Sequence, residues 1–434
     1  MAHLVHRPPI DGSPGAVVER LDQSRELSDE LLSRLGCRLC SATVGANSQR
    51  ERALFGRVSG CAVTDDGDVE CFGLMTFSVA SGSGGFTEPR QCWPTRRGRR
   101  TIANMLPVLD LGQADDNPRP FQLSLREAAH RSGFFYLVGH GIETERMHEM
   151  LRLAREFFAV PDHVKDEISQ LKSPHFRGYS RVGGELTNGR VDWREQVDIG
   201  SERPAIDGAV GYWNLQGPNL WPSQPAGFRE TFEQWERTVS GLGLRLLRHW
   251  AQSLGAPANV FDDAFATAPA TLMKVVRYPG TPDHSQGVGA HKDSGVLTLL
   301  LVEPDSTGLQ VETTADTWID VPPLDGAFIV NIGELLEVAT GGYLRATRHR
   351  VVAPGPDNDR ISVPHFLSPA LDALVPVIEL PAELARQSRG VENDPANPIY
   401  STYGENAWKS RTRAHPDVAQ LHHGIAAAGR QSAY

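Results

Sequence analysis

The segment Gly289-Ala-His-Lys-Asp-Ser-Gly295 carries two side chains that can bind a metal, and they are separated by one residue. In an extended strand, residues i and i+2 lie on the same face. His291 and Asp293 can therefore point into one cavity, while Lys292 between them is directed away. Two ligands at the end of one strand leave a third ligand to be found for a three-point metal site.

His349, in the segment Arg345-Ala-Thr-Arg-His-Arg-Val351, is the candidate third ligand. It follows the first two by several predicted strands of the same sheet system. Two histidines and one carboxylate on one face of a metal are typical of non-haem Fe(II) sites, because the open positions bind co-substrate and O₂. Zinc also accepts this set of ligands, so the triad alone leaves iron and zinc open.

Arg360 and Ser362 form a second pair at i and i+2 spacing, one predicted strand beyond His349. A guanidinium can hold a carboxylate with two parallel hydrogen bonds, and a nearby serine hydroxyl can add a donor. A surface arginine after the Pro-Asp-Asn-Asp turn is the alternative interpretation. The position of the pair shortly after the third ligand favours a carboxylate-binding site.

The sequence around these motifs is rich in short β-type segments punctuated by Pro, Gly and Asp. Several short strands at this spacing predict a sandwich or a barrel. The predicted strands are Leu272–Tyr278, Val296–Glu303, Leu309–Thr313, Trp318–Val321, Ala327–Ile332, His349–Val352 and Ile361–Leu367.

Helical periodicity dominates the region before these strands. Apolar spacing and terminating residues predict helices that are interrupted by a buried strand and turn. The predicted helices are Phe121–Arg131, Glu143–Phe158 and Gly227–Leu254, and the strand and turn cover Gly133–Ile142. An apolar strand is expected directly after Met105, and residues 174–225 are expected to form a loop region rich in Gly, Trp and Pro.

Residues 1–104 differ in composition from the rest of the chain. They contain 13 Arg, no Lys and 12 Asp or Glu, together with a Ser/Gly-rich run at 78–85 and a basic stretch at 96–100. A helix is expected at 16–35, and all five cysteines of the protein lie in this part. Cys37 and Cys40 form a CxxC pair without a second such pair, so we interpret the cysteines as incidental thiols rather than a zinc or redox site.

Overall composition excludes several classes of protein. The formal net charge of −10 argues against a nucleic-acid partner, which would favour a basic face. No apolar run approaches the ~20 residues needed to span a bilayer. The N-terminus lacks the basic and apolar regions of a signal peptide. We therefore expect a cytoplasmic protein without nucleic-acid or membrane partners.

The order H-x-D, a later H and then R-x-S resembles that of the 2-oxoglutarate/Fe(II) oxygenases, and more narrowly that of the isopenicillin N synthase-like branch. The resemblance covers roughly residues 105–425. Its other matching segments are Leu106–Leu111, Gly133–Gly141, Phe176–Tyr179, Glu195–Asp198, Tyr278–Gly280 and Asn331–Gly333.

This resemblance implies an α+β, mainly β fold with a double-stranded β-helix (jelly roll) core flanked by helices. It also implies Fe(II), 2-oxoglutarate and O₂ as reactants. The activity would couple oxidative decarboxylation of 2-oxoglutarate to oxidation of a small organic substrate. The expected layout is an extension at 1–104 that is poorly structured or precedes a natural start at Met105, a helical and β region at 105–260, the jelly-roll core at 261–380 and a C-terminal helix and tail at 381–434. We expect a monomer or a homodimer.

The resemblance also implies roles for single residues. Iron would bind His291, Asp293 and His349, and the far carboxylate of 2-oxoglutarate would bind Arg360 and Ser362. Tyr278 occupies the position at which the family often places a tyrosine that helps to hold the co-substrate, although simple packing before Pro279 explains it equally well. Arg277 could meet a carboxylate of the substrate or could be a solvated side chain. No catalytic side chain is expected beyond the metal centre.

Other functions remain open at this point. Isopenicillin N synthase uses no 2-oxoglutarate and yet carries a similar Arg and Ser, so the pair indicates carboxylate binding without saying which carboxylate. An enzyme that cleaves 2-oxoglutarate to ethylene and succinate, an oxidase of small 2-oxo acids, and a non-catalytic jelly-roll sensor are the alternatives. A zinc hydrolase is disfavoured because the segment around His291 offers no glutamate as general base.

Overall fold

The computed structural model describes residues 106–426 except 284, 315, 316, 393 and 396, together with the backbone of four short strands between residues 54 and 79. The chain divides into two compact units, Met1–Asn104 and Met105–Tyr434. The division falls where the composition changes.

The first unit, which we expected to be poorly structured, contains two antiparallel strand pairs. The paired strands are β1 (Leu54–Arg57) with β4 (Thr76–Val79), and β2 (Cys61–Val63) with β3 (Val69–Cys71). The helix predicted at 16–35, together with Cys37, Cys40 and Cys92, lies outside the described residues.

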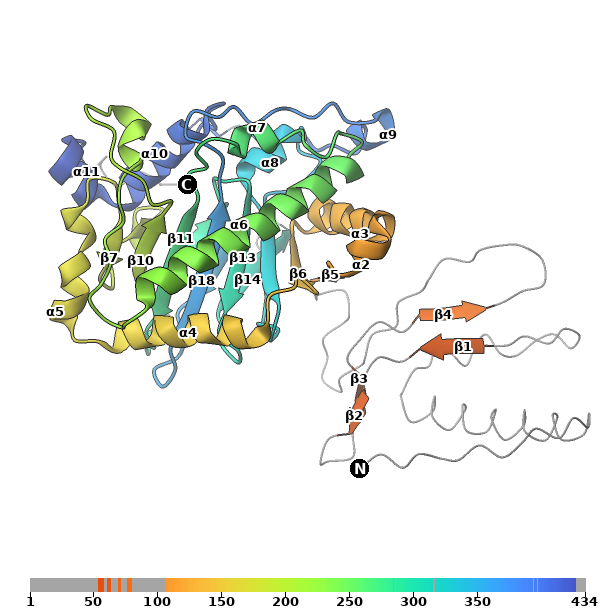
Figure 1. Cartoon of the computed structure of the whole chain (residues 1–434), viewed down its shortest axis with the longest axis horizontal. Helices are drawn as coiled ribbons and strands as arrows, with labels where there is room; N and C mark the ends of the chain where they lie inside the picture. Colours follow the sequence, from red (N-terminus) through yellow and green to blue (C-terminus); the bar gives the residue numbers. More distant parts are fainter. Residues whose placement is uncertain are drawn as a thin grey trace, which may run out of the picture. The chain divides into compact units, whose positions relative to one another are not determined.

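Two sheets form the centre of the second unit (Figure 1). The larger sheet has eight strands in the order β5 (Val108–Asp110), β6 (Phe134–Val138), β16 (Phe328–Ile332), β13 (Leu297–Val302), β18 (Arg360–Leu367), β11 (Leu272–Tyr278), β10 (Glu195–Gly200) and β7 (Gly178–Ser180). The smaller sheet has four strands in the order β12 (Gln286–His291), β17 (His349–Val352), β14 (Leu309–Thr314) and β15 (Thr317–Asp320). All neighbours are antiparallel except β5 and β6. The predicted jelly-roll core is confirmed.

Alternation along the strands separates two hydrophobic clusters. On β11, Met273 and Val275 belong to a cluster shared with the helices, whereas Val276 and Tyr278 belong to a cluster shared with the smaller sheet. Successive side chains of a strand point to opposite faces, which explains this division. The inner face of the larger sheet therefore looks toward the smaller sheet, and its outer face looks toward the helices.

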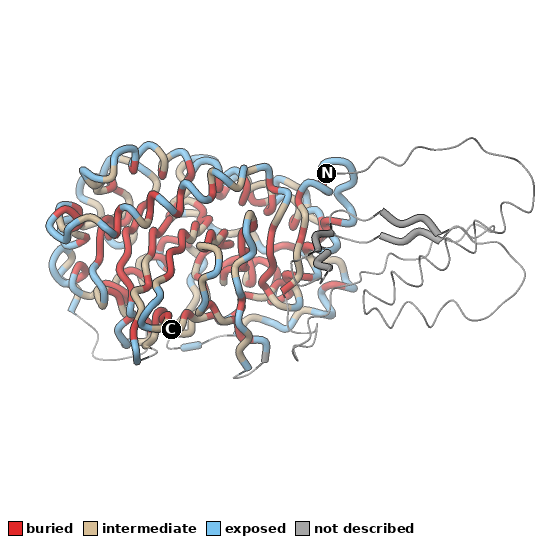
Figure 2. Tube along the Cα trace, turned by 90° about the horizontal axis from the view of Figure 1, so that it is seen from below, coloured by how far each residue is buried: buried red, intermediate tan, exposed pale blue. Residues whose placement is uncertain are grey.

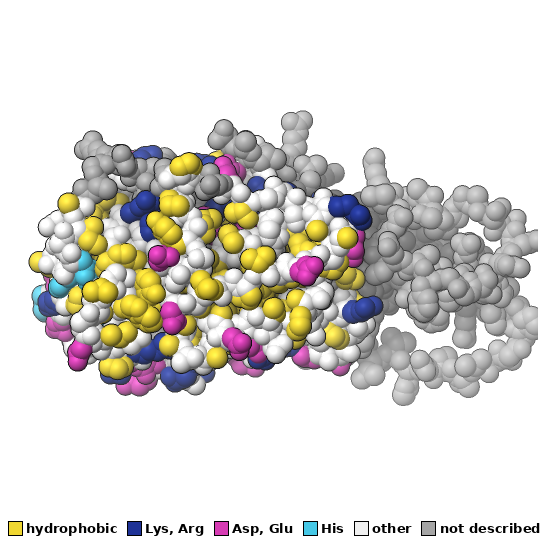
Figure 3. Space-filling model, turned by 90° about the horizontal axis from the view of Figure 1, so that it is seen from above, with side chains coloured by type: hydrophobic (Ala, Val, Ile, Leu, Met, Phe, Trp, Pro, Cys, Tyr) yellow, Lys and Arg dark blue, Asp and Glu magenta, His cyan; other side chains and the backbone are white. Residues whose placement is uncertain are grey.

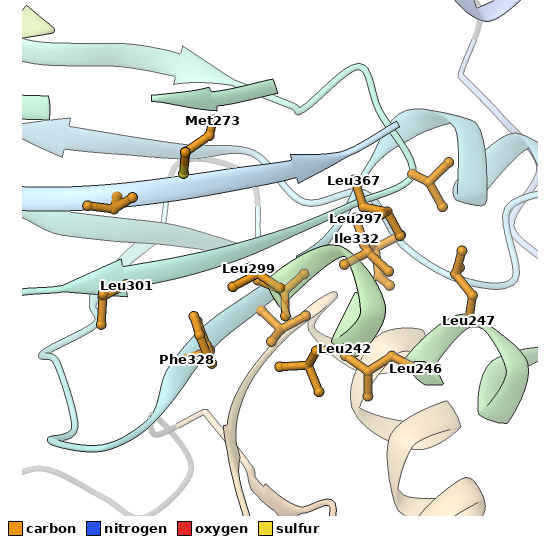
Figure 4. Close-up of a cluster of buried hydrophobic side chains, with 14 of the residues drawn as sticks. Leu242, Leu246, Leu247, Met273, Leu297, Leu299, Leu301, Phe328, Ile332 and Leu367 are labelled. Carbon is orange, nitrogen blue, oxygen red and sulfur yellow. The ribbon is translucent and has the colours of Figure 1, made fainter. Parts of the chain in front are cut away.

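The longest helices cover the outer face of the larger sheet (Figure 1). They are α3 (Pro118–Arg131), α4 (Thr144–Ala159) and α6 (Phe228–Ser253), and each is close to the helix predicted there. Figure 4 shows leucines of α6 packed against apolar side chains of the strands; the labelled leucines are Leu242, Leu246 and Leu247. Residues three or four positions apart on a helix share a face, so the apolar stripe of α6 is buried along its length.

The remaining described helices are short or C-terminal. They are α2 (Gln113–Asp116), α5 (Asp162–Lys165), α7 (Asp262–Phe265), α8 (Glu334–Ala339), α9 (Ala382–Ala385), α10 (Tyr403–Ala414) and α11 (Pro416–His423), with 3₁₀ turns at Asp166–Ile168, Gln170–Lys172 and Gly211–Leu215.

The loop predicted for 174–225 is wrong in part. This region contains β7, the short hairpin of β8 (Leu186–Thr187) and β9 (Arg190–Val191), and β10, whose residues are all buried. Strand β10 reads Glu-Gln-Val-Asp-Ile-Gly, and its polar side chains are buried because they take part in ion pairs and hydrogen bonds. A search for apolar runs therefore does not find it.

Buried residues follow the strands in the middle of this unit, and exposed residues follow its periphery (Figure 2). On the face seen in Figure 3, described Lys and Arg side chains are interspersed with Asp and Glu. None of the described helices combines the length and the apolar character needed to cross a bilayer.

Candidate metal centre

The two histidines lie opposite each other on neighbouring strands of the smaller sheet. His291 ends β12 and His349 begins β17, and the two residues are direct partners in the antiparallel register. The i and i+2 spacing predicted that Asp293 lies within the strand. In the structure it lies two residues beyond the end of β12. The turn after β12 nevertheless returns its carboxylate to the histidines.

The three side chains converge on one point. Asp293 Oδ1 lies 3.5 Å from Nε2 of His291 and 3.6 Å from Nε2 of His349. The two imidazole rings have their centroids 4.3 Å apart, and one potential ligand atom from each residue lies within 4.8 Å of the others. Two imidazole nitrogens and one carboxylate oxygen can thus occupy one face of a metal ion.

Backbone carbonyls orient both histidines. Nδ1 of His291 lies 2.8 Å from the carbonyl oxygen of Gly289, and Nδ1 of His349 lies 3.1 Å from that of Thr347. A carbonyl can only accept, so each Nδ1 carries the proton and donates. Each Nε2 is then the basic nitrogen, which is the arrangement that metal-binding histidines require.

The second oxygen of Asp293 is fixed by two donors. Asp293 Oδ2 accepts a hydrogen bond from the hydroxyl of Thr298 and another, at 2.8 Å, from the amide of Asn331. These donors hold the carboxylate so that Oδ1 faces the histidines. The sequence analysis assigned no role to either donor. Asn331 was visible only as part of a family segment, and nothing in the sequence distinguished Thr298.

Burial sets the charge of the site. Burial and the neighbouring His291 lower the pKa of His349 to about 4. Burial alone would raise the pKa of Asp293, but the two histidines and the Asn331 amide outweigh it and hold the pKa well below its usual value. The carboxylate is therefore ionised and His349 is neutral near neutral pH, which suits a divalent cation because its ligands must be deprotonated.

The second pair of predicted residues lies on the inner face of the larger sheet. Arg360 begins β18 and is paired in register with Tyr278, while Ser362 is paired with Val276. Nη1 of Arg360 donates to the hydroxyl oxygen of Ser362 at 3.1 Å, and the guanidinium lies 4.8 Å from the centroid of the Tyr278 ring. The structure therefore brings these three predicted residues together.

Arg360 keeps an unused donor in the interior. Its side chain is 2% exposed, and its Nη2 has no hydrogen-bond partner among the described residues. Burial lowers the pKa of this guanidinium below its usual value. A buried cationic donor without an acceptor is costly unless a ligand completes it, and a carboxylate is the acceptor that fits a guanidinium best.

Arg277 faces the other way. It follows Val276 on β11, and its guanidinium donates to Glu195 and to Asp359, each at 2.8 Å. Its side chain is 31% exposed. The structure thus does not bring Arg277 to Tyr278 and Arg360 but to an ion-pair network on the outer face.

A cavity of about 130 Å³ adjoins the metal centre. His291 and Asp293 line it, together with charged and polar side chains that the sequence analysis did not single out. The principal ones are Arg177, Glu185, Arg194, Lys274, Tyr403 and Arg411. They come from the residue before β7, from β11, from α10 and from the segment around the β8–β9 hairpin, so no sequence spacing connects them.

Comparisons with known protein families match the fold and the site. A family described as the non-haem dioxygenase in morphine synthesis N-terminal domain matches residues 106–224. The 2OG-Fe(II) oxygenase superfamily matches residues 270–369, which contain the metal triad and the Arg360 pair.

Individual relatives and solved structures come from the same superfamily. The 2-oxoglutarate-dependent dioxygenase frbJ of Dothideomycetidae sp. (strain 11243) is 33% identical over 339 residues, which cover 73% of this chain and 91% of the relative. Homoarginine-6-hydroxylase 2-ODD-C23.1 of Arabidopsis thaliana is 31% identical over 63% of this chain and 88% of its own. The solved structure of a 2OG-Fe(II) oxygenase family protein from Caulobacter crescentus shares the fold, with a TM-score of 0.57 and 24% identity over 70% of this chain and 96% of that chain.

A jelly roll that brings two histidines and a carboxylate together is typical of a non-haem iron oxygenase, and the family comparisons decide in favour of this class. The chain belongs to the 2-oxoglutarate/Fe(II) oxygenase superfamily. It is an Fe(II)- and 2-oxoglutarate-dependent dioxygenase that couples oxidative decarboxylation of 2-oxoglutarate to oxidation of a small organic substrate. The comparisons give no support to the ethylene-forming, 2-oxo-acid oxidase or sensor alternatives.

Proposed function

We propose that His291, Asp293 and His349 bind the Fe(II) of this dioxygenase, and that Arg360, Ser362 and Tyr278 bind the far carboxylate of 2-oxoglutarate. The convergence of two histidine Nε2 atoms on Asp293 Oδ1 is the observation that carries the proposal. The unused Nη2 of the buried Arg360 supports the second part, because no described residue offers it an acceptor and a bound carboxylate would.

When bound, Fe(II) supplies the open positions at which 2-oxoglutarate and O₂ react. The residues of the chain hold and shield the reactants. The Gly289 and Thr347 carbonyls keep the histidine rings in place, and the donors on Asp293 Oδ2 favour binding of the metal through Oδ1 alone. Burial of Arg360 and Tyr278 excludes water from the co-substrate, which strengthens the charge-assisted hydrogen bonds there.

The proposal is tested by titrating 2-oxoglutarate into the protein with Fe(II) under anaerobic conditions and following the metal-to-ligand charge-transfer band. We expect one equivalent of 2-oxoglutarate to develop the band, and succinate to form once O₂ is admitted. The matched variant Asp293→Asn keeps the size of the side chain and removes its charge, so it should show no band. A band of full intensity in that variant would refute the assignment of the ligand.

We further propose that the primary substrate carries a carboxylate that binds Arg177. Of the described cations that line the cavity, Arg194 and Lys274 pair with Glu185, Lys292 with Glu337 and Arg411 with Asp198. Arg177 has no carboxylate within 4 Å among the described residues. Its Nη2 donates to the carbonyl of Leu215 at 2.9 Å, and its Nε has no partner.

A single carboxylate fits this arrangement better than a phosphate dianion, because one buried guanidinium is left to be neutralised. Burial lowers the pKa of Arg177 to about 10, so the group remains cationic at neutral pH and still favours an anion. The name of the Arabidopsis relative gives homoarginine as its substrate, and an amino acid of that kind carries such a carboxylate.

A substrate screen tests this second proposal. Succinate formation is measured with small amino acids and carboxylic acids, homoarginine among them, and with the corresponding amides. Acids should stimulate turnover and amides should not. Arg177→Gln should raise the KM of an active acid by on the order of 10–100-fold, the equivalent of one lost hydrogen bond to a charged group. Arg181→Gln removes an exposed arginine that pairs with Asp166, so it serves as the control. Amides that work as well as acids would contradict the proposal.

The location and assembly of the protein remain predictions from its sequence. We propose a cytoplasmic enzyme that acts as a monomer or a homodimer and has no nucleic-acid or membrane partner. Size-exclusion chromatography with light scattering at several concentrations checks the assembly, and a mass above that of a dimer would contradict it.

A further inference from the structure

The β8–β9 hairpin packs beside the strand that carries His291. Its turn residues Asn188 and Gly189 both have positive φ, 54° and 67°. Two positive φ angles in a two-residue loop are typical of a tight hairpin turn whose twist suits antiparallel strands. The amide of Asp192 closes the base of the hairpin by donating to the carbonyl of Glu185 at 3.0 Å. We refer to residues 185–194 as the cover hairpin.

Strand β12 is irregular directly before His291. Its register against β17 shifts between Gln286 and Val288, and again between Val288 and His291. Such shifts interrupt the hydrogen bonds between the two strands, so backbone groups of β12 must find hydrogen-bond partners elsewhere. The segment 286–290 is therefore not positioned by β17 alone.

The cover hairpin supplies partners to this segment. The amide of Trp193 donates to the carbonyl of Gln286 at 2.7 Å, and the side-chain amide of Asn188 donates to the carbonyl of Ala290 at 3.0 Å. Asp192 Oδ1 accepts from Gln286 Nε2 at 2.9 Å and, more weakly, from the amide of Gly289 at 3.4 Å. These contacts span the irregular stretch up to the residue before His291.

Asp192 connects the hairpin to the strand through its two oxygens. While Oδ1 faces β12, Oδ2 accepts from the hydroxyl of Thr187 at 2.7 Å and from Nη2 of Arg194 at 3.3 Å, both within the cover hairpin. The side chain is fully buried. A buried carboxylate that uses both oxygens has little freedom to move, because each displaced hydrogen bond would leave a charge uncompensated.

Gly289 transmits this position to the proposed metal ligand. Its carbonyl accepts the hydrogen bond from Nδ1 of His291, and its amide points to Asp192. A Cβ at Gly289 would lie 2.7 Å from Cγ2 of Thr187, so the backbone here packs directly against the hairpin. A shift of the Gly289 peptide would thus turn the His291 ring.

We infer that Asp192 is a positioning residue, which fixes the irregular segment of β12 and thereby sets the direction in which His291 presents Nε2. This inference rests on the proposed function of His291 as an iron ligand. It also connects the cover hairpin to the cavity, because Glu185, Thr187 and Arg194 of the hairpin line that cavity beside His291.

The test uses Co(II), whose absorption bands report the geometry of its ligands, added to the full-length protein. Asp192→Ala should weaken Co(II) binding by on the order of 10–100-fold, as loss of a residue that orients a metal ligand typically does. The visible bands of the Co(II) complex should shift. Asp192→Asn keeps one acceptor oxygen and should recover part of the affinity.

Glu195→Gln is the matched control. Glu195 is a buried carboxylate that accepts hydrogen bonds from Lys165, Tyr179 and Arg277, and among the described residues its side chain makes no hydrogen bond to β12. Its loss should lower thermal stability and leave Co(II) affinity within about twofold, which separates positioning from general destabilisation. Co(II) binding and spectra like those of the wild type in Asp192→Ala would overturn the inference.

A second variant covers the case in which the Asp192 variants do not fold. Asn188→Gly keeps the positive φ of the turn and removes the hydrogen bond to the Ala290 carbonyl, so it loosens the hairpin from β12 without burying an unpaired charge. It should weaken Co(II) binding several-fold, and unchanged binding would overturn the inference. His291→Ala tests the metal site separately from the role of Asp192: if this variant binds Co(II) as the wild type does, the proposed metal site itself fails.

Discussion

Arginines lie on both faces of the sheet at strands β11 and β18, and they differ in whether carboxylates of the chain neutralise them. On the outer face, Arg277 donates to Glu195 and Asp359, and Arg155 of α4 donates to Asp359 and Glu303. On the inner face, Arg360 has a serine hydroxyl and an aromatic ring as neighbours and keeps Nη2 without a partner. Arg277 and Tyr278 are adjacent in the sequence, so alternation along a strand separates the two environments.

The number of carboxylates paired with each arginine distinguishes a structural arginine from a ligand-binding one. The outer arginines are neutralised by carboxylates of the chain itself, and they therefore stabilise the packing of α4 on the sheet. Arg360 is more deeply buried and less well paired, although a buried charge without a partner destabilises a protein. An incomplete ion pair in the interior indicates that the missing partner comes from outside the chain.

Substitutions in the proposed metal triad should have the largest effect on activity. If His349 is one of the three proposed ligands, its removal leaves two, which cannot define a face of the metal. We expect His349→Ala to lose Fe(II)-dependent succinate formation entirely and to keep its fold, as judged by circular dichroism. Asp293→Glu should also fail, because an added methylene shifts the ligand oxygen by more than the ~0.2 Å tolerance of such distances. Residual activity in His349→Ala would remove the triad from consideration.

Substitution of Arg360 should have the second largest effect, a loss of affinity for 2-oxoglutarate. Losing one partner of a buried ion pair typically costs ~3–5 kcal/mol, on the order of 10²–10³-fold in affinity for 2-oxoglutarate. Arg360→Lys should recover only part of this, because an ammonium cannot form two parallel hydrogen bonds. The charge-transfer titration measures both variants, and Fe(II) affinity should hardly change. If Arg360→Ala bound 2-oxoglutarate as tightly as the wild type, the residue would hold another ligand.

Arg277 should behave in the opposite way. Arg277→Ala leaves Glu195 and Asp359 with fewer donors, so we expect the free energy of unfolding to fall by ~1–3 kcal/mol. The affinity for 2-oxoglutarate should stay within about twofold, because the side chain lies on the other face of the sheet. Urea denaturation and the same titration measure the two quantities. A large loss of co-substrate affinity without loss of stability would reverse the comparison.

Removal of residues 1–104 should have the smallest effect. Every residue of both arginine environments and of the metal centre follows Met105, where the second compact unit begins. Expression from Met105 should therefore give a protein with kcat and 2-oxoglutarate affinity within about twofold of the full chain. An insoluble or inactive product would show that the first unit takes part in folding.

Local rules were sufficient to predict the core of the site. Alternation in strands grouped Arg360 with Ser362, and apolar periodicity found α4, α6 and β11 within a residue or two. The i and i+2 spacing also grouped His291 with Asp293, although the turn after β12, and not alternation within the strand, brings them together. The same reasoning could not assign Arg277, because the acids that bind it, Glu195 and Asp359, lie 82 residues away on either side. A solvated arginine, a structural one and a substrate-binding one look alike in the sequence.

The parts that were missed depend on contacts between distant segments. Thr298 and Asn331 orient Asp293 from two other strands, and Arg177 lines the cavity from the position directly before β7. Strand β10 was included in the predicted loop because residues 174–225 are rich in Gly, Trp and Pro, and its own Glu and Asp residues give no apolar run that would indicate a buried strand. Their partners are Lys165, Arg411 and others that only the folded chain brings close. Buried polar strands of this kind are outside the reach of hydrophobic patterns.

The position of β12 in the smaller sheet has a consequence for assembly. It is the first strand in the order, so one of its edges pairs with β17 and the other has no strand of that sheet beside it. An open strand edge is a template on which another chain can add, which leads to aggregation. Here the cover hairpin occupies part of that edge through Trp193 and Asn188. The cover hairpin, which we infer to position β12, therefore also protects this strand from pairing with a second molecule.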